Sequence, residues 1–379
     1  MSDDRVTLRI DGRNFGGWLS IEITRSLEQA AASFALAVSS RWPGETNPIR
    51  IRPGSACEIL VGSETVITGY VDSVAPKLEA TAYSIAVAGR SKTGDLVDCS
   101  AVHTPGRWRK RKIEQVAATL AQPFGVSVLA QVSTGLALPR FALESGETVQ
   151  EAIERMARLR QLLVTDDAEG RLVLTRAGTG RAQVAIEQGA NLLGGEAKAD
   201  ASGVFSTYTV RGQRVGDDQD FGEAVARVTG EATDDALARH RPLVVNAEAQ
   251  VTGASAKARA QWEAATRLGR SLEATVTVQG WRQKPGGKLW APNLLVDVKA
   301  PALGLDGSFL ISGVSLTLGD GGTLARLDLA LPDAYRAEPP TPGAKGSRKA
   351  AGLWKEINRG VPVDSSTAPP RQSFAKAAP

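Results

Sequence analysis

The chain is poor in the residues from which most catalytic and metal sites are built. Its 379 residues include two histidines and two cysteines, and aromatic residues make up only 5%. His103 and His240 lie in different regions, and Cys57 and Cys99 do not form a metal-type pair, so closely spaced His and Cys ligands are missing. We expect the cysteines to be buried free thiols, as in a reducing compartment, with a disulfide as the less favoured alternative.

Long apolar runs are also missing. The sequence has no stretch of about 18 apolar residues, so we expect no membrane insertion. Its first ten residues, MSDDRVTLRI, have neither the basic region nor the apolar core of a signal peptide, which predicts production in the cytoplasm. A hydrophobic fraction of 42% and a charged fraction of 23% are typical of a globular protein, and the length suggests several domains.

The excess of positive over negative charge is confined to one end of the chain. The formal net charge is +4, but residues 336–379 carry eight Lys/Arg against three Asp/Glu and so have a charge of +5. Residues 1–335 keep −1, and a nearly neutral body does not imply a general nucleic-acid-binding surface. The segment 336–379 is rich in Pro, Ala, Ser and Lys and is expected to be disordered, with Gly352–Gly360 as its one candidate docking segment.

No complete catalytic motif occurs. The stretch Gly253–Lys257 begins like a nucleophile elbow but lacks the final glycine, which favours a helix N-terminus capped near Ser255. The stretch Gly89–Thr93 resembles the end of a phosphate-binding loop but lacks its glycine spacing, which favours a strand-end loop. Three acidic clusters lack calcium-loop spacing and are interpreted as solvated loops, although a carboxylate pair for glycoside hydrolysis needs no local motif: Asp166-Asp167, Asp217-Asp218-Asp220 and Asp234-Asp235. We therefore predict no catalytic, cofactor-binding or metal-binding residues.

One local cluster has a positive signal. Residues 107–112 place five basic side chains around Trp108. Such a run can grip phosphates and stack a base, or it can be a solvated loop that leads into a helix at Ile113 with Trp108 packed on the domain. The neutral body favours the loop.

The first and last parts of the body have the pattern of β-structure. Residues 1–95 contain several short alternating segments separated by turn signals, which predicts a small barrel or sandwich. Strand patterns return in residues 181–335. They are interrupted over about 213–270 by a polar loop and by a helix that opens near Ser255 and closes at Gly269.

Residues 96–180 have a different period. Apolar residues follow helical spacing from Ile113, and a second helix is predicted from Thr148, whose hydroxyl forms a capping box with Glu151. Two short strands around a turn follow within Leu162–Thr175. This order predicts a small α+β domain between the two β regions.

The two β regions share a faint similarity. The first contains PGSACEILVG followed by VITGYVDSV, and the last contains PNLLVDV followed by FLISGVSLT. Residues 57–59 align with residues 296–298, and the second strands align in either of two registers one residue apart. A duplicated barrel and a chance similarity are equally weighted interpretations of this pattern.

The residues that carry a wider resemblance occur in order along the chain. They are Val6–Arg9, Gly17-Trp18, Thr24–Ser26, Thr68–Ser73, Ala88–Arg90, Lys92-Thr93, Asp95–Cys99, Gly146–Val149, Gly170–Thr175, Tyr208–Val210, Arg241-Pro242, Gly280-Trp281 and Leu289–Val296. In this order, residues 1–335 resemble the baseplate hub proteins of contractile phage tails, of the Mu-like family. The segment after Arg336 has no clear match, and the basic run 107–112 goes beyond the family pattern.

The resemblance implies a mostly β, α+β fold and a homotrimeric ring. Two tube-like β-barrel domains (1–95 and 181–335) would flank the small α+β domain (96–180), with a helix-containing insertion in the second barrel. Three chains would present six similar barrels, which match a six-fold tail tube on one side and a trimeric central spike on the other. DNA would pass through the channel without sequence-specific binding. The location implied is the tail baseplate of a virion, assembled with other baseplate proteins in the cytoplasm of a bacterial host.

The resemblance also bears on a tryptophan-bracketed hairpin. Trp281 and Trp290 flank a Pro-Gly-Gly turn, and we favour core packing of both over direct contact with a partner. In the strand that follows, Leu294, Val296 and Val298 are predicted to face the core. Leu295 and Asp297, which alternate with them, are predicted to face a neighbour or the lumen.

Two other classes of function remain open at this point. A tail-associated cell-wall hydrolase predicts a cleft with two facing carboxylates. A nucleic-acid-binding module predicts salt-sensitive binding through residues 107–112. Neither explains the paired β regions.

Overall fold

The computed structural model describes residues 4–39, 51–80, 83–178, 180–213, 228–247, 251–319, 321–336 and 339. The fold is mostly β. The chain divides into two compact units, residues 1–197 with 274–330 and residues 198–273 with 331–379. The acidic loop around 217–220 and the candidate docking segment 352–360 lie outside the described residues.

The N-terminal strands follow from alternating burial. They are β1 (Val6–Ile10), β2 (Arg13–Phe15), β3 (Ser20–Ser26), β4 (Ser33–Ser39), β5 (Ala56–Val61), β6 (Glu64–Leu78) and β7 (Tyr83–Ser91). In β1, Val6, Leu8 and Ile10 are buried while the residues between them are partly exposed. The turn into β2 has positive φ at Asp11 and Gly12, as a tight hairpin requires.

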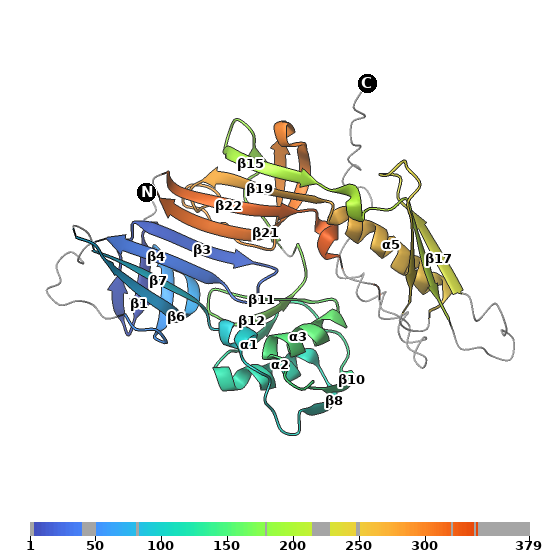
Figure 1. The fold of residues 1–379 in the computed structure, drawn as a ribbon, viewed down its shortest axis with the longest axis horizontal. Coiled ribbons are helices and arrows are strands. Elements are labelled where there is room, and N and C mark those ends of the chain that lie inside the picture. Colours follow the sequence, from blue (N-terminus) through green and yellow to red (C-terminus); the bar gives the residue numbers. More distant parts are fainter. Residues whose placement is uncertain are drawn as a thin grey trace. The chain divides into compact units, whose positions relative to one another are not determined.

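A second group of strands that joins the same sheet comes from residues 180–330. It comprises β13 (Gly180–Arg181), β14 (Ile186–Glu187), β15 (Leu192–Ala199), β19 (Leu272–Gln279), β20 (Leu294–Ala300), the 3-10 helix η3 (Pro301–Leu303), β21 (Leu305–Gly319) and β22 (Gly322–Ala330). With the N-terminal strands they form one sheet in the order β15-β19-β22-β21-β3-β4-β7-β6-β5-β1-β2, and β20 pairs with β21, β13 and β14. Figure 1 shows β3 lying beside β21. Among the described residues the pairing is an open path rather than a closed barrel.

The small α+β part has the predicted helices. Its elements are α1 (Gly94–Asp98), β8 (Arg107–Arg111), α2 (Ile113–Ala121), η1 (Gln122–Phe124), β9 (Val128–Ala130), β10 (Leu138–Ala142), α3 (Val149–Arg158), β11 (Leu163–Asp166) and β12 (Leu172–Thr175). The apolar faces of α2 and α3 meet in one core that includes Ile113, Ile153 and Met156, each fully buried. The helix at Ile113, the helix after Thr148 and the two strands of 162–175 are thereby confirmed.

The second unit packs a helix on a short sheet. It contains η2 (Ala201–Gly203), β16 (Thr207–Gly212), β17 (Val228–Thr233), β18 (Pro242–Asn246), α5 (Gly253–Gly269) and η4 (Pro332–Tyr335), with sheet order β17-β16-β18. A Cβ at Gly230 would lie 2.1 Å from the Lys257 backbone nitrogen, so only glycine permits this approach of β17 to α5. The predicted helix is confirmed, but Thr252 caps it and Ser255 is the third helical residue of its capping box.

The tryptophan hairpin packs as predicted. Trp281 is 1% exposed and Trp290 is 3% exposed, and Trp281 Nε1 donates to the Thr317 carbonyl oxygen at 3.0 Å. In β20, Val296 and Val298 are fully buried, whereas Asp297 is exposed and pairs with Arg181 at 2.6 Å. The residues predicted to face outward therefore lie toward β13 of the same chain.

The expectation that both cysteines are buried is confirmed for Cys57 and is wrong for Cys99. Cys57 is buried, with a pKa raised to about 12 chiefly by burial, whereas Cys99 is partly exposed, and both are free thiols. No helix in the described part of the chain is long and apolar enough to cross a membrane.

The cap of α3 makes a first prediction. Thr148 Oγ1 accepts from the Glu151 N–H at 3.2 Å, and the Glu151 carboxylate accepts from the Thr148 N–H at 2.8 Å. Replacing Thr148 with Ala should destabilise the fold by about 1 kcal/mol, because an N–H at the helix start loses its partner. Thermal unfolding measures the change. Thr148→Ser is the control and should keep most of the stability; an equal loss in both variants would contradict the capping role.

Candidate assembly interface

A three-stranded unit occurs twice in the large sheet. Strands β6 and β21 are both 15 residues long, and β7 and β22 are both nine residues long. In the first copy the register shifts between Val71 and Ser73, which pair with Gly89 and Ala88. In the second it shifts between Ile311 and Gly313, which pair with Leu329 and Asp328. The bulges at Asp72 and Ser312 therefore occupy equivalent places.

The spatial order of strands repeats as well. The sequence β3-β4-β7-β6-β5 in the first copy corresponds to β15-β19-β22-β21-β20 in the second. The structure thus supports an internal duplication and confirms the alignment of Cys57 with Val296, since their partners are Gly69 and Phe309. It also shows that the Thr-Gly and Ser-Gly pairs of the second strands, which suggested the alignment, are not equivalent.

Among the described strands, one pair joins the two copies into a single sheet. Strand β3 runs antiparallel to the second half of β21, from Ser26 opposite Gly313 to Ile21 opposite Leu318. The Leu27 N–H donates to the Ser312 carbonyl at the bulge at 2.8 Å. Ile23, Val314 and Leu316 are buried there, so this junction combines a backbone ladder with an apolar contact.

The α+β part is fastened close to this junction. The Asp166 carboxylate at the end of β11 accepts from the Ala32 N–H at 2.9 Å, and Thr165 Oγ1 donates to the Ser26 carbonyl at 3.2 Å. The interpretation of Asp166 as part of a solvated loop is wrong, because it is 5% exposed and burial raises its carboxyl pKa. A Cβ at Gly170 would lie 2.6 Å from the Thr68 carbonyl, so this turn also lies against β6.

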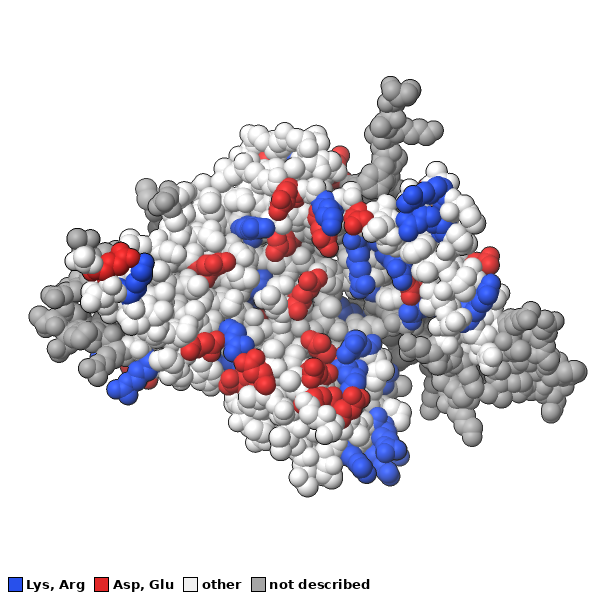
Figure 2. Space-filling model, viewed as in Figure 1, with Lys and Arg blue, Asp and Glu red and all other residues white. Residues whose placement is uncertain are grey.

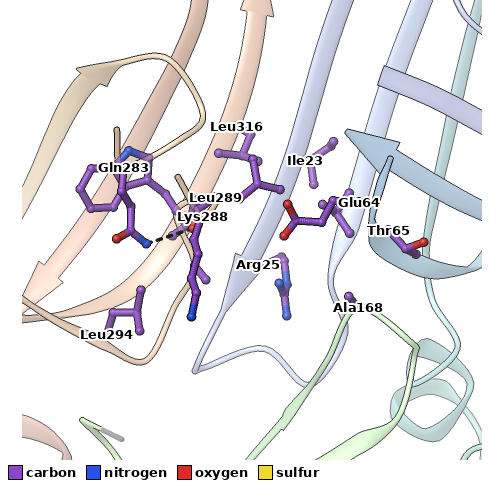
Figure 3. Close-up of a pocket in the computed structure, with 14 residues that line it drawn as sticks. Ile23, Arg25, Glu64, Thr65, Ala168, Gln283, Lys288, Leu289, Leu294 and Leu316 are labelled. Atoms are coloured by element: carbon purple, nitrogen blue, oxygen red, sulfur yellow. Dashed lines mark hydrogen bonds between the residues drawn. The ribbon is translucent and has the colours of Figure 1, made fainter. Parts of the chain in front are cut away.

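A pocket of about 300 Å³ opens at the same junction (Figure 3). Its apolar lining comes from β3, β6, β20, β21, the tryptophan hairpin and Ala168, and Glu64 is the one carboxylate that lines it. Glu64 accepts from Arg282 at 3.2 Å, and Gln283 Nε2 donates to the Leu289 carbonyl at 3.1 Å. The single carboxylate that lines the pocket is paired with an arginine, and the other charged residues that line it are Lys288 and Arg25, so the pocket does not hold the carboxylate pair that a glycosidase uses.

The other sequence candidates do not converge. His103 stacks on Trp108 with ring centroids 4.9 Å apart in the α+β part, whereas His240 is exposed in the second unit. Thr93 is buried at the start of α1, so the 89–93 stretch is a strand end that leads into a helix. Among the described residues no group of three His, Cys, Asp or Glu is arranged to hold a metal ion.

The basic run 107–112 is a strand rather than a loop. Residues Arg107–Arg111 form β8 and pair with β10, so the expected loop is wrong. Trp108 is only partly exposed, and its ring centroid lies 6.0 Å from that of Phe141. The flanking basic side chains are exposed to solvent. Figure 2 shows basic side chains at the edge of the α+β part, and acidic and basic groups interspersed elsewhere on the visible face of that unit.

Comparison with protein families gives three matches along the chain. Residues 5–91 match the N-terminal domain of Mu phage baseplate assembly protein GpP-like, residues 93–176 the second domain of baseplate hub protein gp44-like, and residues 252–338 the fourth domain of Mu phage baseplate assembly protein GpP.

Individual relatives cover most of the chain. Baseplate hub protein gp44 of Escherichia phage Mu is 40% identical over 335 residues, which are 86% of this chain and 87% of that protein. The 43 kDa tail protein of prophage MuSo2 from Shewanella oneidensis has 34% identity and a TM-score of 0.78, with 88% of this chain and 100% of that one covered. The tail protein of Neisseria meningitidis MC58 shares the fold at 24% identity and a TM-score of 0.70, covering 87% of this chain and 98% of that one.

Asp166 provides a test of how the α+β part is fastened. Asp166→Ala should destabilise the fold by about 1–3 kcal/mol, because the buried Ala32 N–H loses its acceptor. Asp166→Asn keeps an acceptor and removes the charge, so it should be tolerated. The pKa of the Asp166 carboxyl is raised in the folded protein above the ordinary Asp pKa of about 3.9. The wild type therefore loses stability relative to the Asn variant as the pH rises from about 3.9 through the pKa of the folded protein.

Unfolding curves at about pH 4 and pH 7.5 measure both effects. The free energy of unfolding of the Asn variant minus that of the wild type should be smaller at the acidic pH. An advantage that grows on acidification would contradict the assignment of a buried, raised carboxyl.

Proposed function

Because this chain belongs to the family of baseplate hub proteins of Mu-like phages, we propose that three copies form the hub ring of a contractile tail. In this proposal the ring joins the six-fold tail tube to the trimeric central spike and lines the channel for DNA. Its partners are two further copies of the chain, the tube protein, the spike protein and other baseplate proteins. It acts in the tail baseplate of the virion after assembly in the bacterial cytoplasm.

The observation that carries the proposal is the repeated β-unit. Each chain has two similar units with bulges at equivalent places, and they are already joined side by side in one sheet. Three chains then offer six similar units on one circle. Such a ring can bind a six-fold partner through its six repeated units and a three-fold partner through its three whole subunits. The tube-like barrels predicted from the sequence belong to this assembly proposal.

A structural role without covalent chemistry fits the site. The pocket at the junction holds one carboxylate, which is paired with Arg282, and Asp166 is bound to a backbone N–H. Both arrangements use carboxylates to connect segments rather than to activate water. The near-neutral charge of residues 1–335 fits a channel through which DNA passes without binding tightly to the wall.

The solution mass of the purified chain tests the ring. Light scattering behind a sizing column should give three times the 39.8 kDa of one chain, about 119 kDa. Electron microscopy of that species should show a ring with six repeated units around a channel. A chain that stays monomeric at all concentrations, alone and with tube and spike proteins, would overturn the proposal.

A further inference from the structure

The pocket at the junction of the two β-units is lined by two cations that lack an anionic partner. They are Arg25 and Lys288, and neither side chain forms an ion pair or a hydrogen bond with another described residue. The one carboxylate of the lining, that of Glu64, is bound by Arg282, which also binds Asp4 at 2.8 Å. The charges of the lining itself therefore favour an anion.

The two cations lie on the same side of an apolar surface. Arg25 follows Ile23 by two residues in β3 and lies opposite Val314, so it shares the inward face of the junction. Figure 3 shows the side chains of Arg25 and Lys288 extending in the same direction, away from Ile23 and Leu316. One anionic group beside the apolar surface can thus face both cations.

Two buried donors at the pocket also have no acceptor among the described residues. Trp290 lines the pocket and is 3% exposed, and neither its Nε1 nor Arg25 Nε is bonded. The charge of Asp166 acts on Arg25, but that carboxylate accepts its hydrogen bond from a backbone N–H elsewhere. Buried donors nearly always find acceptors, so these two groups point to an acceptor that comes from outside the chain.

The size and the apolar lining of the pocket limit what enters it. Its volume of about 300 Å³ is at the lower end of the range of about 300 to 1,000 Å³ for small-ligand sites. This space admits one or two large side chains but not a helix or a strand pair. Six aliphatic side chains contribute to the apolar lining: Ile23, Val66, Leu289, Leu294, Val314 and Leu316.

We propose that the junction pocket binds a short segment of a neighbouring baseplate protein in which a large apolar side chain adjoins a carboxylate. The apolar side chain packs against Ile23, Leu294 and Leu316, and the carboxylate lies against Arg25 and Lys288. The inference rests on the structural role proposed above and names the chemistry of one segment that docks on this chain.

The charge of the pocket selects among possible occupants. The chain's own residues 336–379 carry +5, so two unpaired cations disfavour that segment. Lys288 is exposed, which lets a carboxylate of another protein reach it from solvent. Its backbone is held in place, because the Lys288 N–H donates to Gln183 Oε1 at 3.2 Å and its carbonyl accepts from the Gln283 N–H at 2.9 Å. The ammonium group is therefore presented from a fixed backbone.

Three small probes separate the two parts of this recognition. N-acetylphenylalanine has the apolar side chain and the carboxylate, its amide lacks the charge, and N-acetylglycine lacks the apolar side chain. In ligand-observed NMR titrations of the full-length chain, N-acetylphenylalanine should bind with a Kd on the order of 1 mM. Each of the other two should bind at least about tenfold more weakly, because a charge-assisted bond or the apolar contact is lost.

Substitutions assign the binding to this pocket. Lys288→Gln and Arg25→Gln should each weaken N-acetylphenylalanine about threefold to tenfold and leave binding of the amide unchanged. Lys284→Gln is the matched control, because Lys284 is exposed in the same hairpin but does not line the pocket, and it should change neither. Ala291→Leu narrows the pocket and should weaken both probes, with thermal unfolding to show that the variant folds.

Several outcomes would overturn the inference. Equal binding of N-acetylphenylalanine and its amide would mean an apolar cavity without selection for an anion, and equal binding of N-acetylglycine would mean an anion site without an apolar part. Decanoate that binds at least about tenfold more tightly than N-acetylphenylalanine would assign the pocket to a lipid carboxylate rather than to a protein segment. Loss of binding in Lys284→Gln as large as in Lys288→Gln would place the probe outside the pocket.

Light scattering keeps this test distinct from that of the ring. A trimeric chain without selective binding of N-acetylphenylalanine overturns the inference and leaves the proposed function standing. A persistent monomer overturns the ring, and selective binding that is lost in Lys288→Gln then still supports the ligand chemistry assigned to the pocket.

Discussion

The pairing of β3 with the second half of β21 is the constraint on which the large unit depends. It connects strands nearly 300 residues apart in the chain and turns two similar β-units into one sheet. Hydrogen bonds along this ladder fix the register, and the burial of Ile23, Val314 and Leu316 fixes which face turns inward. The α+β part attaches through Asp166 and Thr165 to the segment that follows β3, so its position depends on the same strand.

The pocket beside this junction is crossed by polar contacts between segments that are far apart in the chain. Several polar groups there hold segments together: Arg282 binds Asp4 and Glu64, and Gln283 binds the hairpin backbone. These contacts hold the hairpin and the N-terminal strands in fixed positions, which suits a protein proposed to connect neighbouring proteins in an assembly.

Local patterns in the sequence predicted the elements whose determinants are local. The cap at Thr148, the stripes of α2 and α3, and the buried tryptophans of the hairpin all depend on residues within a turn or two of each other. Strand β8 was missed because four of its five side chains are basic and exposed, so no apolar alternation marks it. The burial of Asp166 was missed because its partner, Ala32, lies 134 residues away. The repeat was noticed, but its second-strand register was set by a dipeptide similarity that the two bulges do not follow.

The bulges at Asp72 and Ser312 have a geometric consequence for assembly. A bulge bends its strand and increases the local twist, so each one sets the angle between successive β-units. Head-to-tail contacts close into a ring only when that angle sums to a full turn, and otherwise they continue as an open helix. Because the two bulges occupy equivalent places in the two β-units, both units can present the same local bend to their neighbours. In such an assembly the local geometry at two inserted residues would bear on the choice between a closed circle and a filament.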